Sequence, residues 1–331
     1  MDLLTSSRLK SFRTCPRKHF YEYVEGYRAV ADSEALAFGT LVHSCLEAYW
    51  NARKALPGHP EQWTEAAFDP IPEDVEPFTL ARLRPMLIGY AASWERVECE
   101  VLEVEREFRL PLVNPDTGHP SRTWMLGGKI DLILRLADGR VAVVDHKTSS
   151  ESIEPGSDFR RRLVMDGQLS QYWRGCEALG YAVDVAIWDA LSKTSLRPAK
   201  ATAPESRRYT KDGRLYANQR EFDETADEFE ERVCAAIEAD PASHFAQIEV
   251  QRLEDERDGY DVNVWHLATS MREAKRYGAA VYNPDSCVRS RCPFLAVCEG
   301  TQSIDDPSKF RRIDPARPHE ELSVNGASNA A

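Results

Sequence analysis

The sequence of 331 residues is long enough for one or two domains with a full hydrophobic core. Hydrophobic residues make up 42% and charged residues 29% of the chain, as in an ordinary soluble globular protein. No segment approaches about 18 uninterrupted apolar residues and no signal peptide is apparent, so we expect a cytoplasmic protein without a membrane partner. The net charge of −12 excludes a protein that coats nucleic acid non-specifically, but it leaves room for a local groove that contacts a phosphate backbone.

The first hundred residues carry mostly helical patterns. Residues 5–24 predict two short helices separated by a proline, which cannot continue the first of them. Residues 35–54 have apolar side chains at helical spacing, and residues 76–97 predict a further helix. The intervening segment 55–76 is rich in proline and acidic residues, which predicts a loop.

The hydrophobic period then changes from helical spacing to alternation. Residues 101–110, 124–136 and 141–150 each predict a strand, and Asp138-Gly139 supplies a turn between the last two. These three segments predict one antiparallel three-stranded unit.

The second half of the chain completes the predicted order of elements. Residues 160–181 predict a helix and residues 182–191 a strand, so the elements follow one another as αβββαβ in an α/β core with a mixed sheet. Residues 195–221 are polar and basic and predict a loop that contacts a substrate. Residues 223–239 and 265–277 predict two more helices.

Charged residues stand at the end of an otherwise apolar strand. Asp145 and Lys147 point to the same face of the strand that they end, and Asp131 lies on the preceding strand. A register that brings Asp131 opposite Asp145 would gather two carboxylates and one ammonium, and a divalent cation would relieve the repulsion between the carboxylates. A lysine beside such a cation can orient or deprotonate a water, or stabilise charge on a phosphate. The alternative is an exposed ion pair between Asp145 and Lys147, which is common on protein surfaces.

The length of the hairpin loop decides whether this site can form. A two-residue turn at Asp138-Gly139 would place Asp131 opposite His146, on the wrong face of the sheet. The site therefore requires a loop with an odd number of residues or a β-bulge.

Two helices carry further candidate residues. His43 follows Gly39 by four residues on the helix that precedes the sheet, and Gln168 and Tyr172 lie on one face of the helix that follows the third strand. Taken alone, His43 could be a buried core histidine and Tyr172 a core aromatic residue.

Taken together, these motifs resemble the PD-(D/E)XK nuclease superfamily, and within it the RecB-like branch that includes CRISPR-associated exonucleases. The four motifs are Gly39 to His43, "GGKIDLI" with Asp131, "DHK" at 145–147 and "QLSQY" at 168–172. The resemblance spans about residues 5–300. It implies a restriction-endonuclease-like αβββαβ core with a mixed central sheet and flanking helices.

The resemblance also implies roles for individual residues. A site for Mg²⁺ or Mn²⁺ would have four ligands, namely His43, Asp131, Asp145 and the backbone carbonyl of His146. Lys147 would assist the nucleophilic water, and Gln168 and Tyr172 would position the DNA strand.

The eight cysteines fall into two groups, and disulfides are not expected in a reducing compartment. Isolated cysteines among apolar or helical neighbours are expected to be small buried residues: Cys45, Cys99, Cys176 and Cys234. Cys287, Cys292 and Cys298 are clustered as Cys-x4-Cys-x5-Cys, and three such thiols require a fourth ligand for a tetrahedral site. Cys15 is a candidate because proline follows it, as proline follows Cys292.

RecB-like nucleases that carry a cluster place one cysteine before the core and three after it, so the resemblance suggests a [4Fe–4S] cluster on these four thiols. Four thiolates suit Zn²⁺ equally well by sequence, and zinc is the alternative. On this interpretation residues 1–30 and 280–300 form an iron–sulfur staple, residues 31–279 form the nuclease core with helical insertions, and residues 313–331 form a disordered tail.

The expected function is that of a metal-dependent DNA exonuclease that hydrolyses phosphodiesters at single-stranded ends. Recombination, repair, phage DNA metabolism and CRISPR spacer processing are all consistent with it, and so is a protein partner from recombination or CRISPR adaptation. No Gly-x4-Gly-Lys-Ser/Thr motif occurs, so no helicase motor is expected in this sequence. Two alternatives remain: an endonuclease of the same chemistry, and a non-cleaving DNA-binding or assembly subunit with the nuclease fold.

Overall fold

The computed structural model describes residues 1–331 except residues 32–33, 279, 290, 315–318, 320–321 and 323–331. The strands of the described residues are β1 (Asp2–Leu4), β2 (Tyr27–Ala29), β3 (Cys99–Val113), β4 (Pro120–Leu136), β5 (Val141–Ser149), β6 (Val185–Ser192), β7 (Phe245–Val250) and β8 (Phe310–Arg312). The helices are α1 (Ser6–Thr14), α2 (Pro16–His19), the π-helix η1 (Phe20–Val24), α3 (Glu34–Ala55), α4 (Pro60–Ala66), α5 (Pro77–Glu95), α6 (Asp158–Met165), α7 (Gln168–Ala178), α8 (Ala226–Ala239), α9 (Glu254–Tyr277), α10 (Pro284–Arg289), α11 (Leu295–Cys298) and the 3₁₀ turns η2 (Pro204–Ser206) and η3 (Pro241–Ser243).

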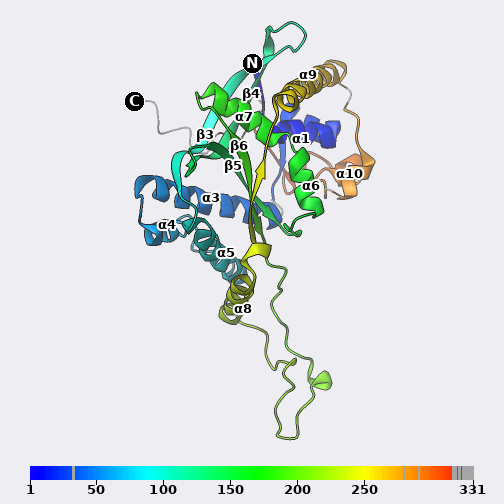
Figure 1. Ribbon diagram of the computed structural model, residues 1–331. Coiled ribbons are helices and arrows are strands. Elements are labelled where there is room, and N and C mark those ends of the chain that lie inside the picture. The colour runs from blue at the N-terminus through cyan, green and yellow to red at the C-terminus, as the bar shows by residue number, and fades with distance from the viewer. Residues whose placement is uncertain (32–33, 279, 290, 315–318, 320–321, 323–331) are drawn as a thin grey trace.

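A mixed six-stranded sheet forms the centre of the molecule (Figure 1). β4 pairs antiparallel with β3 and with β5, whereas β5 pairs in parallel with β6. β7 is antiparallel to β6, and β1 makes a short parallel pairing with β4. Because α3 and α5 precede β3 and because α6 and α7 connect β5 to β6, the order is αβββαβ. The predicted α/β core with a mixed sheet is therefore confirmed.

The hairpin between β4 and β5 has three loop residues rather than two. Leu136 donates its N–H to the carbonyl of Arg140 at 2.9 Å, and Gly139 has a φ of 88°, the left-handed conformation that ends a three-residue hairpin loop. The paired residues include Leu132 with Val144. Continuing this register by one residue places Asp131 opposite Asp145. The odd-length loop on which the predicted site depends is thus present, and a two-residue turn is excluded.

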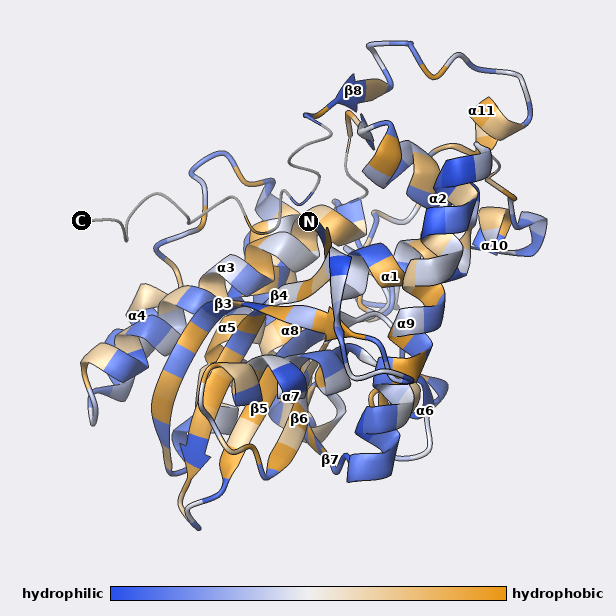
Figure 2. Cartoon of the chain, turned by 90° about the horizontal axis from the view of Figure 1, so that it is seen from above, coloured by the Kyte–Doolittle hydropathy of each residue, from blue (hydrophilic) through white to orange (hydrophobic). Residues whose placement is uncertain are grey.

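Helices cover both faces of the sheet and bury most of its side chains. α3, α5 and α8 pack on one face, around a core that contains Trp50, Trp94 and Phe229. α6 and α7 pack on the other face, around Phe108 and Trp188. The strands between these layers are mostly hydrophobic, as the orange segments of Figure 2 show. None of the helices in the described residues combines the length and the apolar character needed to cross a bilayer.

The helix α7 lies unusually close to the sheet because it presents a glycine there. A Cβ atom on Gly175 would lie 2.7 Å from the ring of Phe108 on β3. The fully buried side-chain amide of Gln171 donates to the carbonyls of Leu4 and Gly127, at 3.0 and 2.9 Å, and so joins α7 to β1 and β4. These contacts fix the position of α7, which carries two of the predicted site residues.

The two ends of the described chain meet beside this core. β2 and β8 form a small antiparallel sheet, and the side chains of α1 and α9 share a core that contains Leu9 and Val264. Arg17 donates its N–H to the carbonyl of Val281 at 3.1 Å, and the Ser286 hydroxyl donates to the carbonyl of Thr14 at 3.1 Å. Residues near position 15 and residues near position 285 are therefore held side by side.

The loop predicted over residues 55–76 is partly wrong, because α4 forms within it. Pro60 begins this helix, where a missing N–H costs nothing, and Trp63 is buried on the core cluster of α3 and α5. The indole N–H of Trp63 donates to the carbonyl of Leu56 at 2.8 Å. The packing of Trp63 thus stabilises a helix in a segment whose composition is typical of loops.

The basic segment 195–221 is a loop, as predicted, and it projects from the body of the protein between β6 and α8 (Figure 1). It contains only the short turn η2 and an isolated bridge between Tyr209 and Leu215. Most of the predicted disordered tail, residues 313–331, lies outside the described residues. Of the tail residues that the structure describes, His319 is buried and lies with Nε2 3.0 Å from the carbonyl oxygen of Leu3.

We predict that the two helical glycines Gly175 and Gly259 respond to substitution with opposite signs. Gly175→Ala should destabilise the protein by about 1–3 kcal/mol, because the new methyl group would overlap the Phe108 ring. Gly259→Ala should stabilise it by up to about 1 kcal/mol, because Gly259 lies within α9 with nothing near its Cβ position. Urea unfolding of the two variants measures both effects, and a stabilising Gly175→Ala would contradict the close packing of α7.

Candidate active site

Three carboxylates lie side by side across three strands. Val104 pairs with Leu132 and Arg106 with Ile130, so Glu105 on β3 lies across from Asp131 on β4. The β4–β5 register places Asp131 across from Asp145 in turn. The backbone of Glu105 has a φ of 50°, a left-handed conformation that is costly for a residue with a side chain. Such local strain is concentrated at functional sites in folded proteins.

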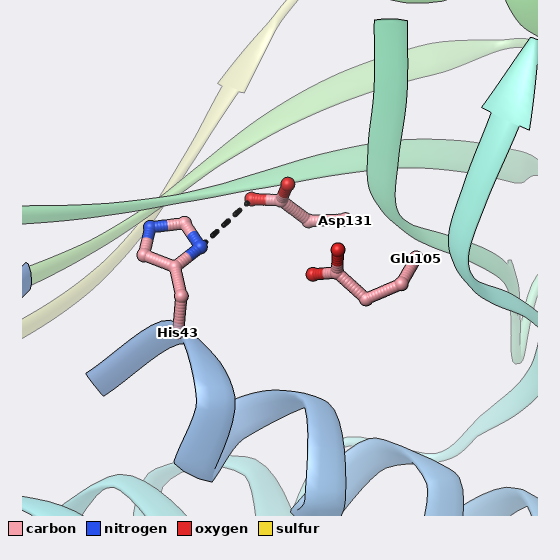
Figure 3. A group of neighbouring side chains, drawn as sticks. All are labelled: His43, Glu105 and Asp131. Carbon is pink, nitrogen blue, oxygen red and sulfur yellow. Dashed lines mark ion pairs between the residues drawn. The ribbon is translucent and has the colours of Figure 1, made fainter. Parts of the chain in front are cut away.

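His43 joins two of these carboxylates from the helix α3. Its Nδ1 lies 3.6 Å from Oδ2 of Asp131, and Glu105 points toward the same space (Figure 3). Within the part of the chain that the structure describes, His43, Glu105 and Asp131 are the group of three whose potential ligand atoms all lie within 4.8 Å of one another. Imidazole nitrogen with carboxylate oxygens is a donor set that suits Mg²⁺ or Mn²⁺.

Glu105 is a candidate ligand that the sequence analysis missed. It belongs to an alternating segment in which Glu103, Glu105 and Glu107 are spaced by two residues and look equivalent. Only the pairing of β3 with β4 singles out Glu105 as the neighbour of Asp131. Nothing in the sequence distinguishes Glu105 from Glu103 and Glu107.

Asp145 and Lys147 form an ion pair next to this group, and Asp145 is almost fully buried. The side-chain amide of Gln168 donates to Oδ1 of Asp145 at 2.8 Å, while the Lys147 ammonium contacts Oδ2. Oδ2 receives no hydrogen bond of ordinary geometry from the described residues. Asp145 is not a member of the 4.8 Å group, so its predicted role as a ligand stays a prediction.

His146 contributes a buried side chain that the sequence analysis did not use. The backbone N–H of His146 donates to Oδ2 of Asp131 at 2.9 Å. The side chain points to the opposite face of the sheet, where its Nδ1 lies 2.8 Å from Oδ2 of Asp189 on β6. Tyr90 and Trp94 of α5 also donate to Asp189. Burial lowers the pKa of His146, but the hydrogen bond and the charge of Asp189 outweigh burial and raise it. The predicted part of the His146 carbonyl as a cation ligand stays a prediction.

Gln168 and Tyr172 face the site from α7, one helical turn apart. The Gln168 amide, besides its bond to Asp145, donates to the Tyr172 hydroxyl at 3.0 Å. Burial, followed by the charges of Asp131 and Asp145, raises the pKa of Tyr172 well above its ordinary value. Tyr172 is therefore a neutral phenol at physiological pH. Their predicted role toward DNA stays a prediction, since the hydrogen bonds of their side chains in the described residues are to Asp145 and to each other.

The site holds more negative charge than its own cations offset. Burial, and then the charge of Asp131, raises the pKa of Glu105 even though Lys129 forms an ion pair with it. Burial likewise raises the pKa of Asp145 against the opposing effect of Lys147. Burial, and then repulsion from His146 and Lys147, lowers the pKa of His43, which keeps its imidazole neutral. A divalent cation suits all three side chains. It would attract the carboxylates of Glu105 and Asp145 and would bind the neutral imidazole of His43.

The four cysteines of the predicted staple lie in one region, between the N-terminal helices and α10 and α11. Cys15 and Cys287 are buried, and Cys292 and Cys298 are partly buried. Burial, and then the neighbouring thiols of Cys15 and Cys298, raises the pKa of Cys287. Among the described residues no three of these thiols form a group within 4.8 Å of one another, so their predicted role as ligands of a cluster or of zinc stays a prediction.

We predict that the affinity of the protein for Mn²⁺ depends on Glu105 and Asp131 but not on Glu103, which lies two residues before Glu105 on β3. Glu105→Gln and Asp131→Asn should each lower the affinity by at least about tenfold, because each removes a charged ligand. Glu103→Gln is the matched control, since Glu103 contacts Lys54 and Tyr181 instead. Calorimetric titration of the folded variants measures the effect, and unchanged binding by Glu105→Gln would remove Glu105 from the metal centre.

Among solved structures, the one described as "Crystal structure of SSO0001" is similar to this chain, with 14% sequence identity, coverage of 92% of this chain and 89% of that chain, and a TM-score of 0.40. A search of curated proteins gives no significant match. The family model described as "PD-(D/E)XK nuclease superfamily" matches residues 3–299, which is nearly the whole chain. The chain therefore belongs to the PD-(D/E)XK nuclease superfamily.

Proposed function

We propose that this metal-dependent nuclease is a DNA exonuclease that hydrolyses phosphodiesters at the ends of single strands. The family supplies the nuclease chemistry and DNA as substrate. The observation that carries the proposal is the close group of His43, Glu105 and Asp131 beside the ion pair of Asp145 and Lys147. A site of this kind needs a scissile phosphate next to both the cation ligands and the lysine.

The chain's own residues would hold and orient the reacting groups. A divalent cation held by His43, Glu105 and Asp131 would supply Lewis-acid stabilisation of the charge on the phosphate. Burial lowers the pKa of Lys147, but the charges of Asp145 and Asp131 outweigh burial and raise it. Lys147 therefore acts as an ammonium that orients the attacking water and attracts the phosphate, rather than as a base. Asp145 fixes the position of that ammonium, and Gln168 fixes Asp145.

The proposed preference for single strands has support in the projecting loop. Tyr209 and Tyr216 are 55% and 49% exposed there, and basic residues surround them in the sequence. Aromatic rings among basic side chains bind unpaired bases by stacking while the cations contact the backbone. The pathway, whether recombination, repair, phage DNA metabolism or CRISPR spacer processing, and any protein partner within it, is a further part of this proposal.

We further propose that Cys15, Cys287, Cys292 and Cys298 hold a [4Fe–4S] cluster with a structural role. The proposal is supported by the proximity of these thiols and by their partial shielding from solvent. The cluster would join α2 to α10 and α11, where hydrogen bonds already hold the two segments together. None of its thiols is part of the candidate active site.

We predict that Lys147→Ala lowers the rate of DNA hydrolysis by about 100-fold or more with Mg²⁺ or Mn²⁺, because a positive charge beside the scissile phosphate is lost. Lys54→Ala is the matched control, since the Lys54 side chain is 42% exposed and pairs with Glu103 outside the site. Release of labelled nucleotides from a linear single strand measures the rate.

A circular single strand of the same sequence separates the alternatives in that assay. An exonuclease leaves the circle intact, and cleavage of the circle at the same rate would instead identify an endonuclease. Equal activity of the native protein and Lys147→Ala would remove the catalytic claim for this site. No activity in the native protein would favour a DNA-binding or assembly subunit that retains the fold.

We predict that anaerobically purified protein absorbs near ~400 nm and contains iron and sulfide. Cys287→Ser should lose this absorbance and the bound iron, whereas Cys234→Ser should keep both, because Cys234 lies apart on α8. Stoichiometric zinc without iron in the native protein would contradict the cluster and support the zinc alternative.

A further inference from the structure

A second cavity, distinct from the cation site, opens at the beginning of α3. Its volume is about 780 Å³, which is sufficient for a phosphate group with its flanking sugar. Phe38 and Leu41 of α3 form one part of its wall, and Ser150, just after β5, forms another. The first-turn N–H groups of α3, which lack partners within the helix, lie at the same end.

Four cations and one acid line this cavity, although the protein as a whole has a net charge of −12. The cations come from separate parts of the chain: Arg82 from α5, Lys193 and Arg197 from the segment after β6, and Arg291 from the segment after α10. The acid is Glu34. Such a local reversal of charge is a property of anion-binding clefts.

The cations of the cavity form no close ion pair with a carboxylate of the described residues, although Glu76 and Glu34 lie near enough to attract Arg82 and Lys193. Among the described residues, no ion pair within 4.0 Å involves Arg82, Arg197 or Arg291, and Nε of Arg82 is buried without a hydrogen-bond partner. The Lys193 ammonium donates to the carbonyl of Ala35 at 3.2 Å and lies 4.9 Å from the centre of the Phe38 ring. Burial, and then repulsion from Arg82, lowers the pKa of Lys193, as expected where cations gather. These donors remain available to an external anion.

The cavity adjoins the candidate active site along two elements. Gly39 of α3 lies against Thr148 of β5, with its Cβ position 3.5 Å from the Thr148 hydroxyl oxygen. Phe38 in the cavity wall precedes His43 by about 8 Å of helix, and Ser150 follows Lys147 by about 10 Å of strand. An anion in the cavity and a phosphate at the cation site can therefore belong to one polymer.

We propose that this cavity binds backbone phosphates of the DNA strand on one side of the scissile bond, through Arg82, Arg197 and Arg291. The inference rests on the proposed function, since it takes DNA as the substrate of the adjoining site. Arginine is suited to this task because its planar group donates two parallel hydrogen bonds to phosphate oxygens. Internal phosphates of the strand are the ligands we assign, and a terminal phosphate offers the same chemistry.

The experiment measures single-stranded DNA binding by fluorescence anisotropy in the Lys147→Ala background, between about 50 and 200 mM salt. Removing three phosphate contacts, with Arg82→Gln, Arg197→Gln and Arg291→Gln combined, should make the slope of log affinity against log salt less negative by about 2. At about 0.1 M salt this corresponds to a loss of about 100-fold in affinity. In the background with Lys147 intact, the triple variant should raise KM and leave kcat nearly unchanged, because the cavity contacts no reacting atom.

Two control variants keep the test independent of folding. Arg197→Gln with Arg291→Gln changes only exposed side chains and should still reduce the slope by about 1.4. Arg135→Gln removes the same charge at the opposite end of β4 and β5, and it should leave binding unchanged. Thermal unfolding of all variants checks that they remain folded.

The outcomes separate this inference from the proposed function. Native affinity and slope in both cavity variants would overturn the inference and leave cleavage untouched. A cavity-dependent slope in a protein whose Lys147-intact form does not cleave DNA would support the inference and overturn the proposed function. Oligonucleotides with phosphate or hydroxyl ends distinguish the two phosphate sources, since an effect limited to phosphorylated ends would assign the cavity to the strand terminus.

Discussion

Electrostatic repulsion among Glu105, Asp131 and Asp145 is the constraint on which the rest of the structure depends. Adjacent strands hold the three carboxylates in one row, where burial, together with repulsion from Asp131, raises the pKa of Glu105 and of Asp145. Lys129 and Lys147 each pair with one member of the row. Asp131, in the middle, instead accepts a backbone N–H and faces the imidazole of His43. This middle position is where an added cation lowers the electrostatic energy most.

The surrounding helices and strands serve to keep this row in place. On one face, Asp189 with Tyr90 and Trp94 holds the side chain of His146 and thereby the end of β5. On the other face, α7 lies close to the sheet and supplies the amide that fixes Asp145. α3 begins at the cation-lined cavity and carries His43 to the row of carboxylates. The core on both faces of the sheet therefore determines the geometry of the site.

Much of the fold follows from local sequence patterns, whereas the site depends on how strands pair. The change from helical spacing to alternation predicts the αβββαβ order, and four spaced motifs identify His43, Asp131, Asp145 and Lys147 as candidates. Local patterns do not encode the register of β3, so Glu105 looks like its neighbours until the sheet is formed. α4 was missed for a similar reason, because tertiary packing of Trp63 overrides a composition typical of loops.

Segments from the beginning and the end of the described chain pair with each other, β2 with β8 and α2 with the segment before α10. The ribosome makes the two members of each pair at different times. Some 270 residues separate Cys15 from Cys287. At ribosomal speeds of about 5–20 residues per second, the first of these thiols waits on the order of 15–50 s for its neighbours to be synthesised. During that interval the central sheet can form, while α2 and β2 still lack their partners. Closure of this junction therefore follows the synthesis of the central sheet, and any inorganic group bound there would be inserted after the strands of that sheet have been made.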